Sequence, residues 1–209
     1  MMPTREEFVA ALAARHGEEL QKRLSAARVA VCGLGGLGSN IAIALARAGV
    51  GQLHLIDFDC VEISNLNRQQ YFVSQLGMPK TEAMRENLRQ IAPYCEVTTD
   101  QIRVNLENLP ALLADDEVVC EAFDSPEAKA MLVNGVLEHF PKKWLVAGNG
   151  MAGLESANRI QTRRISSHFF LCGDGESDVK ACGSLFAARV MACAAHQALT
   201  VLRILAGME

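Results

Sequence analysis

The sequence predicts an α/β fold with a Rossmann-like, doubly wound, mostly parallel sheet that antiparallel strands continue and a C-terminal helix closes. Short apolar runs alternate with helical patterns from Arg28 onward, which is typical of parallel strands joined by helices. A glycine-rich stretch, GLGGLGS, directly follows the first apolar run. After Trp144 the alternation gives way to two closely spaced runs that suit an antiparallel pair.

The predicted elements follow one another without repeats or low-complexity linkers. Short apolar runs predict strands, and longer periodic stretches predict helices. In chain order we expect a helix at 4–24, a strand at 29–32, a helix at 39–48 and a strand at 53–56. A helix from Lys80 to near Pro93, a strand at 96–102, a short helix at 106–114, a strand at 117–123 and a helix with Pro126 in its first position follow. The last elements are a strand from Trp144, an antiparallel pair at 157–165 and 168–172, and a buried closing helix at 185–206 that is a candidate for a dimer interface.

A glycine loop separates the first strand from its helix, with Gly33, Gly35, Gly36 and Gly38 in sequence. Glycines permit a tight turn, close approach of backbone N–H groups to phosphates, and close packing of helix on sheet. The helix amino terminus that follows favours anionic oxygens. Asp57 ends the next apolar run about 20 residues on, where a carboxylate accepts hydrogen bonds from ribose hydroxyls. These residues predict a nucleotide site, and an ordinary strand-to-helix turn is the alternative.

A polar cluster follows Asp57 and Asp59. It consists of Ser64, Asn65, Asn67, Arg68 and Gln69 in SNLNRQ, with Lys80 after them in GMPK. Two cations and several amides suit a polyphosphate chain better than a nicotinamide ring, because charge that develops on a leaving pyrophosphate requires neutralisation. A solvated loop with a helix amino terminus at Lys80 is the alternative.

Asp124 closes the predicted strand at 117–123, so it falls at the same edge of the sheet as Asp57. Ligands of such sheets bind beyond the carboxyl ends of the strands. The alternative role for Asp124 is the N-cap of the helix that begins near Pro126.

Composition agrees with one α/β domain over residues 1–209. We divide it into an N-terminal helical segment (1–27), a nucleotide-binding half (28–143) and a part with antiparallel strands and the closing helix (144–209). A chain with 50% hydrophobic residues supports one sizeable core. A net charge of −4 indicates no overall basic surface for binding nucleic acid or an anionic membrane. No signal-peptide pattern or uninterrupted apolar span occurs, so we expect a cytoplasmic location. Seven scattered cysteines fit reduced thiols.

The motifs GLGGLGS, DFDCVEISNLNRQ and GMPK, in this order, resemble the ThiF/MoeB/HesA family, bacterial relatives of ubiquitin-activating enzymes. The resemblance covers nearly the whole chain, from the helix with Arg15 to ALTVLRILAG. It implies ATP-dependent adenylation, with Mg²⁺, of the C-terminal glycine of a small ubiquitin-like sulfur carrier. The short length and the ARHG and NLNRQQY stretches look most like the compact ThiF form, which implies a ThiS-like carrier in thiamine biosynthesis.

The resemblance also implies roles for individual residues. By this resemblance, the backbone of the glycine loop approaches the nucleotide, and Asp57 binds the ribose. Asp124 binds the Mg²⁺ that accompanies ATP. The resemblance implies that Asn65, Arg68 and Lys80 stabilise the charge of the phosphates. The implied nucleotide site further includes Asp59, Ser64, Asn67 and Gln69. Arg15 resembles an arginine that reaches into the site of a neighbouring subunit, which implies a homodimer; a helix-surface cation is its alternative role.

Departures from the family pattern concern cysteine. No C-x-x-C pair occurs, so we expect no structural zinc. Cys172 and Cys182 flank GDGESDVKA, and Cys182 is either an activated thiol or a small packing residue. Cys32 and Cys193 are predicted to lie in the core, and the five histidines show no ligand spacing.

Three alternatives stand beside a ThiS-like carrier. The same chemistry could act on a MoaD-like carrier in molybdopterin biosynthesis, or the chain could be a nicotinamide-dependent oxidoreductase or a non-catalytic nucleotide-binding scaffold. The SNLNRQ cluster counts against the oxidoreductase. Intact Arg68, Lys80 and Asp124 count against the scaffold.

Overall fold

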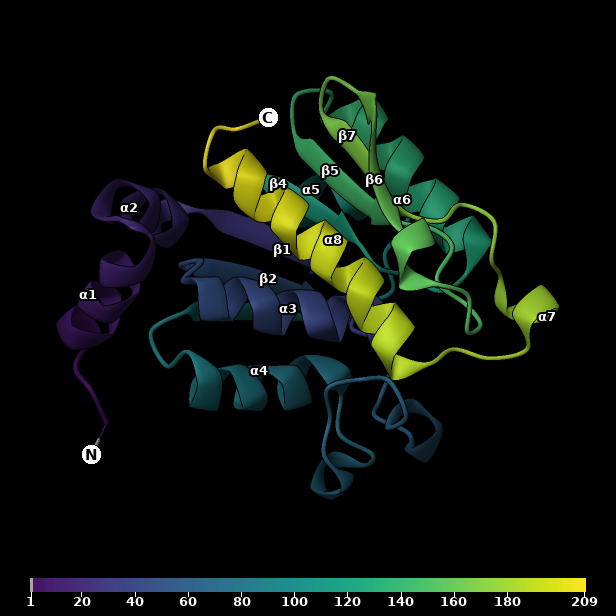
Figure 1. The fold of residues 1–209 in the computed structure, drawn as a ribbon, viewed down its shortest axis with the longest axis horizontal. Coiled ribbons are helices and arrows are strands. Elements are labelled where there is room, and N and C mark those ends of the chain that lie inside the picture. Colours follow the sequence, from purple (N-terminus) through teal and green to yellow (C-terminus); the bar gives the residue numbers. More distant parts are fainter. Residues whose placement is uncertain (1) are drawn as a thin grey trace.

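The structure, a computed structural model, describes residues 2–209 (Figure 1). In this part of the chain, seven strands form one sheet in the order β3-β2-β1-β4-β5-β7-β6. Neighbouring strands pair in parallel except β6 and β7, which are antiparallel. The predicted fold class is therefore confirmed, including the antiparallel pair at the end of the sheet.

The strands are β1 (Arg28–Cys32), β2 (Gln52–Ile56), β3 (Glu96–Asp100), β4 (Val118–Glu121), β5 (Trp144–Gly148), β6 (Gln161–Ser166) and β7 (Phe169–Gly173). The helices are α1 (Arg5–His16), α2 (Glu18–Ala26), α3 (Gly36–Ala48), α4 (Lys80–Ile91), α5 (Leu109–Leu112), α6 (Pro126–His139), α7 (Val179–Cys182) and α8 (Ala187–Leu205). Short 3-10 turns are η1 (Ile63–Asn65), η2 (Val73–Gln75) and η3 (Ala157–Arg159).

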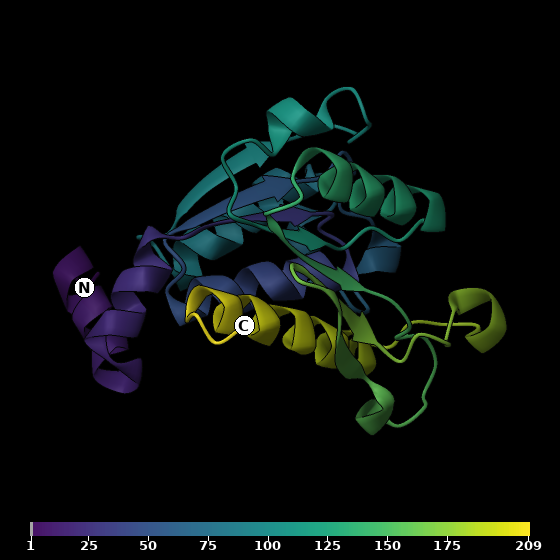
Figure 2. The ribbon, with the colours of Figure 1, turned by 90° about the horizontal axis from the view of Figure 1, so that it is seen from above.

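Helices cover both faces of the sheet, as Figure 2 shows. On one face α3, α4 and α8 pack over a core that includes Ile41, Leu55 and Val201. On the other face α5 and α6 cover a second core with Leu109, Leu132 and other apolar side chains. Full burial of one such side chain contributes about 1.5–3 kcal/mol to folding, so both faces must be covered for the sheet to be stable.

The strand order reverses direction at β1, which lies between β2 and β4. The connections that leave β1 and β4 therefore run to opposite sides of the sheet, toward β2 and toward β5. The Gly33 N–H donates to Ile56 O (2.8 Å) and the Ala122 N–H donates to Cys32 O (2.8 Å). These bonds hold the segments after β1, β2 and β4 together at the edge where such folds bind ligands.

Five predicted elements need correction. The single helix at 4–24 is wrong, because Gly17 has φ +93 and divides it into α1 and α2. The helix at 106–114 is only Leu109–Leu112, since the Asn105 side chain accepts bonds from the Glu107 and Asn108 N–H groups and holds a turn instead. The strand predicted at 96–102 ends at Asp100, and the strand predicted at 117–123 ends at Glu121. The strand predicted at 157–165 begins only at Gln161, because residues 157–159 form the 3-10 turn η3.

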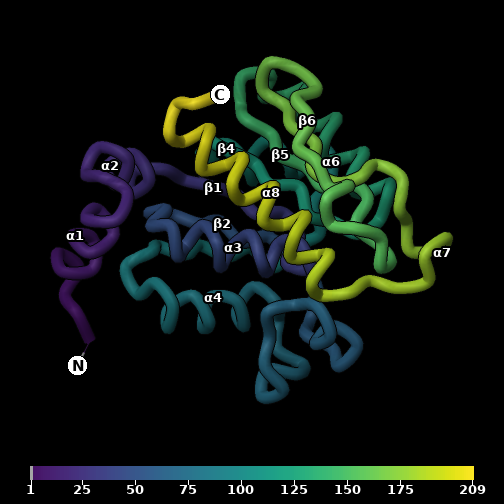
Figure 3. Tube along the Cα trace, in the orientation of Figure 1, coloured from purple at the N-terminus to yellow at the C-terminus, as the bar shows by residue number. Residues whose placement is uncertain are grey.

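The N-terminal helices lie at the opposite end of the strands from the glycine loop. Phe8 of α1 packs edge-on against Tyr94, which precedes β3, with ring centroids 5.9 Å apart. Figure 3 follows the chain from α1 at one end of the molecule to the segment around α7 at the other. Within residues 2–209, no helix combines the length and apolar character needed to cross a bilayer.

Candidate functional site

Three of the four glycines in the glycine loop are packed too tightly for a side chain. A Cβ on Gly38 would lie 1.8 Å from Gly33 O, and one on Gly36 would lie 2.9 Å from Val190 Cγ1. Gly33 has φ +93, and a Cβ on it would lie 2.7 Å from Ala122 O. Among residues 2–209, no side chain caps the amino terminus of α3 at Gly35. The first N–H groups of α3 are thus left for a ligand rather than for a capping side chain.

Asp57 is buried and fastens this loop. Its Oδ2 accepts from the Leu34 N–H (2.6 Å), and its Oδ1 accepts from the Asp59 N–H (2.8 Å). Burial raises the pKa of Asp57, while Lys80 and the two N–H groups offset part of that rise. Tyr71 supports the same turn from the other side, since its hydroxyl donates to Leu34 O (2.8 Å). Each carboxylate oxygen of Asp57 retains a lone pair for a further donor.

Lys80 is buried as the first residue of α4, the position where the sequence predicts a helix start. Its Nζ lies 3.1 Å from Asp59 Oδ2. Asp59 is half exposed, so the ion pair joins a buried lysine to a carboxylate at the protein surface, just after β2. A buried cation needs an anionic partner, and Asp59 supplies it within the chain.

Arg68 and Gln69 flank the glycine loop. The stem of Arg68 packs on Gly36, where a Cβ would lie 3.5 Å from Arg68 Cγ, and Gln69 Nε2 lies 3.8 Å from the equivalent point on Gly35. The Arg68 guanidinium donates to Ser64 O (3.1 Å) and Asn67 Oδ1 (2.8 Å). Gln69 is 7% exposed, and its Oε1 has no hydrogen-bond partner within the described chain. An unpaired buried oxygen at a glycine loop indicates a place for a ligand donor or a water.

Other members of the SNLNRQ cluster bond among themselves or to neighbouring segments. Asn65 Oδ1 accepts from the Glu62 N–H (3.1 Å), and the Ser64 hydroxyl donates to Glu62 Oε2 (3.4 Å). Asn67 instead donates to Leu185 O (3.3 Å), just before α8. Asn67 thus joins the cluster to a segment far along the chain.

Asp124 lies on the loop after β4 and is exposed. Its carboxylate accepts no hydrogen bond from the residues that the structure describes. The alternative N-cap role is wrong, because Ser125 caps α6 and its Oγ accepts from the Ala128 N–H (3.2 Å). The loop passes Gly33, where a Cβ would lie 3.0 Å from Phe123 Cδ1.

Arg15 is not brought to this edge of the sheet. It is exposed in the last turn of α1, beyond the amino ends of β2 and β3. Within one chain it therefore joins none of the residues around the glycine loop.

The cysteines divide by burial. All seven are unpaired, and Cys32 and Cys193 lie in the core as predicted. Cys172 is also buried, and burial raises the pKa of its thiol, so it does not present a reactive thiolate. Cys182 is exposed at the end of α7, with its Sγ 3.3 Å from the Cβ position of Gly153. Across residues 2–209, no three His, Cys, Asp or Glu side chains are grouped to hold a metal ion.

Sequence reasoning missed a buried ion pair behind Asp124. Glu121, 1% exposed, receives Lys129 Nζ at 3.0 Å, and its Oε1 accepts from the Phe123 N–H (2.7 Å). Lys129 also donates to Gly148 O (2.8 Å), and Gln197 donates to Glu121 O (3.0 Å). Burial raises the pKa of Glu121, although Lys129 opposes the rise. A glutamate ending the apolar run VVCE was the available signal.

The fold and this edge of the sheet define a Rossmann-like α/β protein whose glycine loop, cations and acids meet at the topological switch point. The ThiF family matches residues 9–209, and the chain belongs to this family. The resemblance drawn from the sequence motifs is thereby confirmed.

Curated relatives include two Escherichia coli (strain K12) proteins. The chain is 33% identical over 174 residues to a molybdopterin-synthase adenylyltransferase, and the aligned region covers 83% of this chain and 65% of that protein. It is 38% identical over 120 residues to a tRNA threonylcarbamoyladenosine dehydratase, and the aligned region covers 56% of this chain and 45% of that protein. Among the first relatives, the chain spans between 46% and 65% of their length.

The solved structures match over a greater length. The crystal structure of E. coli tRNA N6-threonylcarbamoyladenosine dehydratase in complex with ATP is similar with a TM-score of 0.86 and 26% identity, over 99% of this chain and 98% of that chain. A complex of the same protein with AMP gives a TM-score of 0.84 at 28% identity, over 95% of this chain and 93% of that chain. The whole of the described fold therefore has a counterpart in this group.

Proposed function

We propose that this chain binds ATP with Mg²⁺ and adenylates the C-terminal carboxylate of a ubiquitin-like sulfur carrier. The observation that carries the proposal is the meeting of an uncapped glycine loop, Arg68, Lys80 and the unpartnered Asp124 at one edge of the sheet. Cations and uncapped helix N–H groups at one point suit a polyanion, and a free carboxylate beside them suits its metal ion.

The residues fit a nucleotide. The Gln69 side chain lies next to Gly35 through its Nε2, and its buried Oε1 has no partner within residues 2–209. The glycines leave no side chain between the backbone and a ligand. The solved relative in complex with ATP has the same fold over nearly the whole chain. In this proposal Asp57 accepts from the ribose through its remaining lone pairs while it continues to hold the Leu34 and Asp59 N–H groups.

The reaction needs positioning more than proton transfer. A carboxylate oxygen attacks the α-phosphorus of ATP, the bond from that phosphorus to the bridging oxygen breaks, and pyrophosphate leaves with the bonding electrons. The attacking carboxylate is already ionised at neutral pH, so no strong base is required. Arg68 and Lys80 stabilise the charge that builds on the leaving pyrophosphate, with Asn65 beside them. Bound Mg²⁺ would neutralise phosphate charge, and Asp124 is its carboxylate ligand in this scheme.

The identity of the carrier is the finer part of the proposal. The NLNRQQY stretch favours a ThiS-like carrier and thiamine biosynthesis. The molybdopterin-synthase adenylyltransferases among the relatives support a MoaD-like carrier equally well. The chemistry is the same for a ThiS-like and a MoaD-like carrier, because in each the terminal glycine carboxylate is activated.

A second candidate function comes from the full-length match to tRNA N6-threonylcarbamoyladenosine dehydratase. That modified nucleoside presents a carboxylate on its threonyl group, and the same site geometry suits its adenylation. A net charge of −4 offers no broad basic surface for tRNA, which places this candidate second.

ATP–pyrophosphate exchange separates these possibilities. The chain is assayed with labelled pyrophosphate, ATP and Mg²⁺ in parallel with a ThiS-like carrier, a MoaD-like carrier and threonylcarbamoyladenosine-bearing tRNA. Each carrier has a control that lacks its final glycine, and the tRNA has an unmodified control. We expect exchange only with an intact carrier. Exchange with the modified tRNA alone would replace the leading proposal by the second, and exchange with none would refute both.

We further propose that the working unit is a homodimer, in which Arg15 of each subunit completes the site of the other. Its exposed position at the far end of the strands supports a role between chains rather than within one. The use of ATP as a substrate supports a cytoplasmic location.

A further inference from the structure

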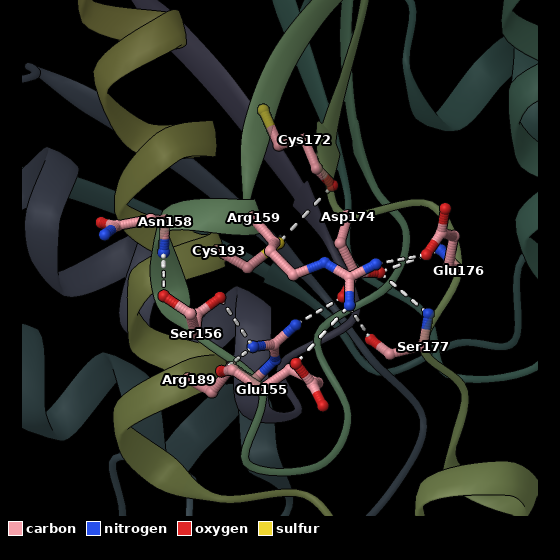
Figure 4. Close-up of polar contacts among 10 residues, drawn as sticks. All are labelled: Glu155, Ser156, Asn158, Arg159, Cys172, Asp174, Glu176, Ser177, Arg189 and Cys193. Atoms are coloured by element: carbon pink, nitrogen blue, oxygen red, sulfur yellow. Dashed lines mark hydrogen bonds and ion pairs between the residues drawn. The ribbon is translucent and has the colours of Figure 1, made fainter.

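A buried arginine lies at the start of α8, outside the residues discussed so far. Arg189 is 4% exposed and belongs to the first turn of that helix. Its guanidinium donates to Ser156 O (3.0 Å), to Glu155 O and to Asp174 Oδ2, as Figure 4 shows. Its Nε has no partner within residues 2–209. Burying a guanidinium is costly unless its geometry is well satisfied, so this position points to a specific task.

Asp174 completes the pair on the loop after β7. Its Oδ1 accepts from the Glu176 and Ser177 N–H groups, both at 2.9 Å, and its Oδ2 accepts from the Ser177 hydroxyl at 2.7 Å. Burial would raise the pKa of Asp174, but the Ser177 and Glu176 N–H groups, the Ser177 hydroxyl and Arg189 outweigh it and hold the pKa well below its usual range. The carboxylate is therefore charged at neutral pH and organises the beginning of residues 174–186, here termed the connecting segment.

The other end of the connecting segment touches the candidate site. Ser184 O accepts from the Gly153 N–H (2.9 Å), and Leu185 O accepts from Asn67 of the SNLNRQ cluster (3.3 Å). Val190 follows Arg189 directly and fills the space over Gly36 of the glycine loop. Residues 184–190, from the end of the connecting segment into α8, thus contact the loop after β5, the polar cluster and the glycine loop.

We propose that the Arg189–Asp174 pair is a positioning clamp that holds the connecting segment against the candidate site. The inference rests on the proposed function for its effect on activity. Arg189 directs Nη1 and Nη2 to oxygens of the protein, so it is a positioning residue and not a phosphate ligand. The pair itself lies beyond β5 and β7, on the far side of β4 from Asp57, and the connecting segment meets the site at Asn67. We therefore expect loss of the pair to affect the carboxylate substrate more than ATP.

The test compares Arg189→Met, Arg189→Lys and Asp174→Asn with Arg203→Met. Arg203 lies on the same helix in an exposed ion pair with Glu209, so it controls for loss of an arginine from α8. The first measurement is trypsin cleavage after Lys180, an exposed residue of the connecting segment, followed by intact mass. We expect cleavage about tenfold faster in Arg189→Met and Asp174→Asn, because a released segment samples open conformations. Arg203→Met should cleave at the wild-type rate.

The second measurement is carrier-dependent pyrophosphate exchange with a recombinant ThiS-like and a recombinant MoaD-like carrier. We expect the KM for the active carrier to rise about tenfold in Arg189→Met while the KM for ATP stays within about twofold. Arg189→Lys should recover part of both effects, and it replaces Arg189→Met if that variant melts below the assay temperature. Unchanged cleavage, or an equal rise in both KM values, would overturn the clamp. Wild-type protein without exchange would refute the proposed function, and the cleavage rates would still decide on the clamp.

Discussion

Lys80 Nζ lies 3.1 Å from Asp59 Oδ2, and the lysine is buried while the aspartate is half exposed. The lysine charge is therefore held in place before any ligand arrives. A polyphosphate that reaches Lys80 competes with one carboxylate at the protein surface and need not reorganise the interior. Preorganised charge of this kind stabilises a transition state without further rearrangement.

Arg68→Ala and Lys80→Ala should each lower carrier-dependent adenylation on the order of 10²-fold, because each removes a cation from the departing pyrophosphate. Pyrophosphate exchange measures the rate, and circular dichroism verifies the fold. Arg47→Ala, an exposed arginine in the last turn of α3, is the matched control and should behave as wild type. Near-normal exchange in both site variants would remove these residues from the site.

Cys172→Ala and Cys182→Ala should each retain carrier-dependent exchange, since formation of an acyl-adenylate precedes any thiol chemistry. Cys172 is buried and Cys182 exposed, so the two variants separate a packing role from a surface role. Loss of exchange in folded Cys182→Ala protein would contradict this expectation. A carrier adduct that thiols release would identify Cys182 as a nucleophile in a later step.

Mixing Arg15→Ala with Asp124→Ala protein should restore part of the activity that each variant lacks alone. In a hybrid dimer with shared sites, one site receives both intact groups. Subunit exchange is verified by native mass spectrometry of differently tagged chains. Confirmed exchange without recovery would show that Arg15 does not act across subunits.

His54 should make folding pH-dependent. It is 2% exposed, and its ring nitrogens lie 2.9 Å from Asp116 Oδ2 and 2.8 Å from Asp100 Oδ2. Burial lowers the pKa of His54, but the hydrogen bonds and charges of Asp116 and Asp100 outweigh it and raise the pKa overall. Arg28 faces one of these acids, since its Nε donates to Asp116 Oδ1 (2.9 Å), and Lys143 Nζ donates to the backbone oxygen of Asp116 (2.6 Å).

Because the folded-state pKa of His54 is raised, its stabilising effect is complete below the unfolded pKa of about 6.5 and is lost as pH rises through the folded value. The free energy of unfolding is measured by urea denaturation from acid to alkaline pH for wild type and His54→Gln. The difference between them should shrink as pH increases above neutrality. A difference that is constant or grows with pH would show that His54 is neutral in the folded protein.

Lys129→Met should destabilise the fold by about 3–5 kcal/mol, because it leaves the Glu121 carboxylate buried without its cation. The double variant with Glu121→Gln should recover part of the loss, since no buried charge remains. Lys142→Met, an exposed lysine near β5, is the control and should change little. Urea denaturation supplies the free energies, and an equal loss in single and double variants would argue against an essential ion pair.

The order of strands and helices was predictable because its signals are local. Apolar runs, glycines and helix starts such as Lys80 act within a few residues of themselves, and the structure places most of them where the sequence indicates. The errors arose where local patterns allow two outcomes. Gly17 is tolerated within a helix or ends one, and in the folded chain its φ of +93 ends α1.

The sequence by itself determined the fold class, the glycine loop and the set of polar residues that follow it. Only the tertiary structure decided which of them meet. Asn67 and Leu185 are 118 residues apart, and His54 and Asp116 are 62 apart, yet each pair is hydrogen-bonded. No periodicity in the sequence links such positions, because their approach depends on strand register and on how α8 docks on the sheet. The partners of Arg189 and Glu121 follow from that docking, which is why these buried charges became visible only in the folded chain.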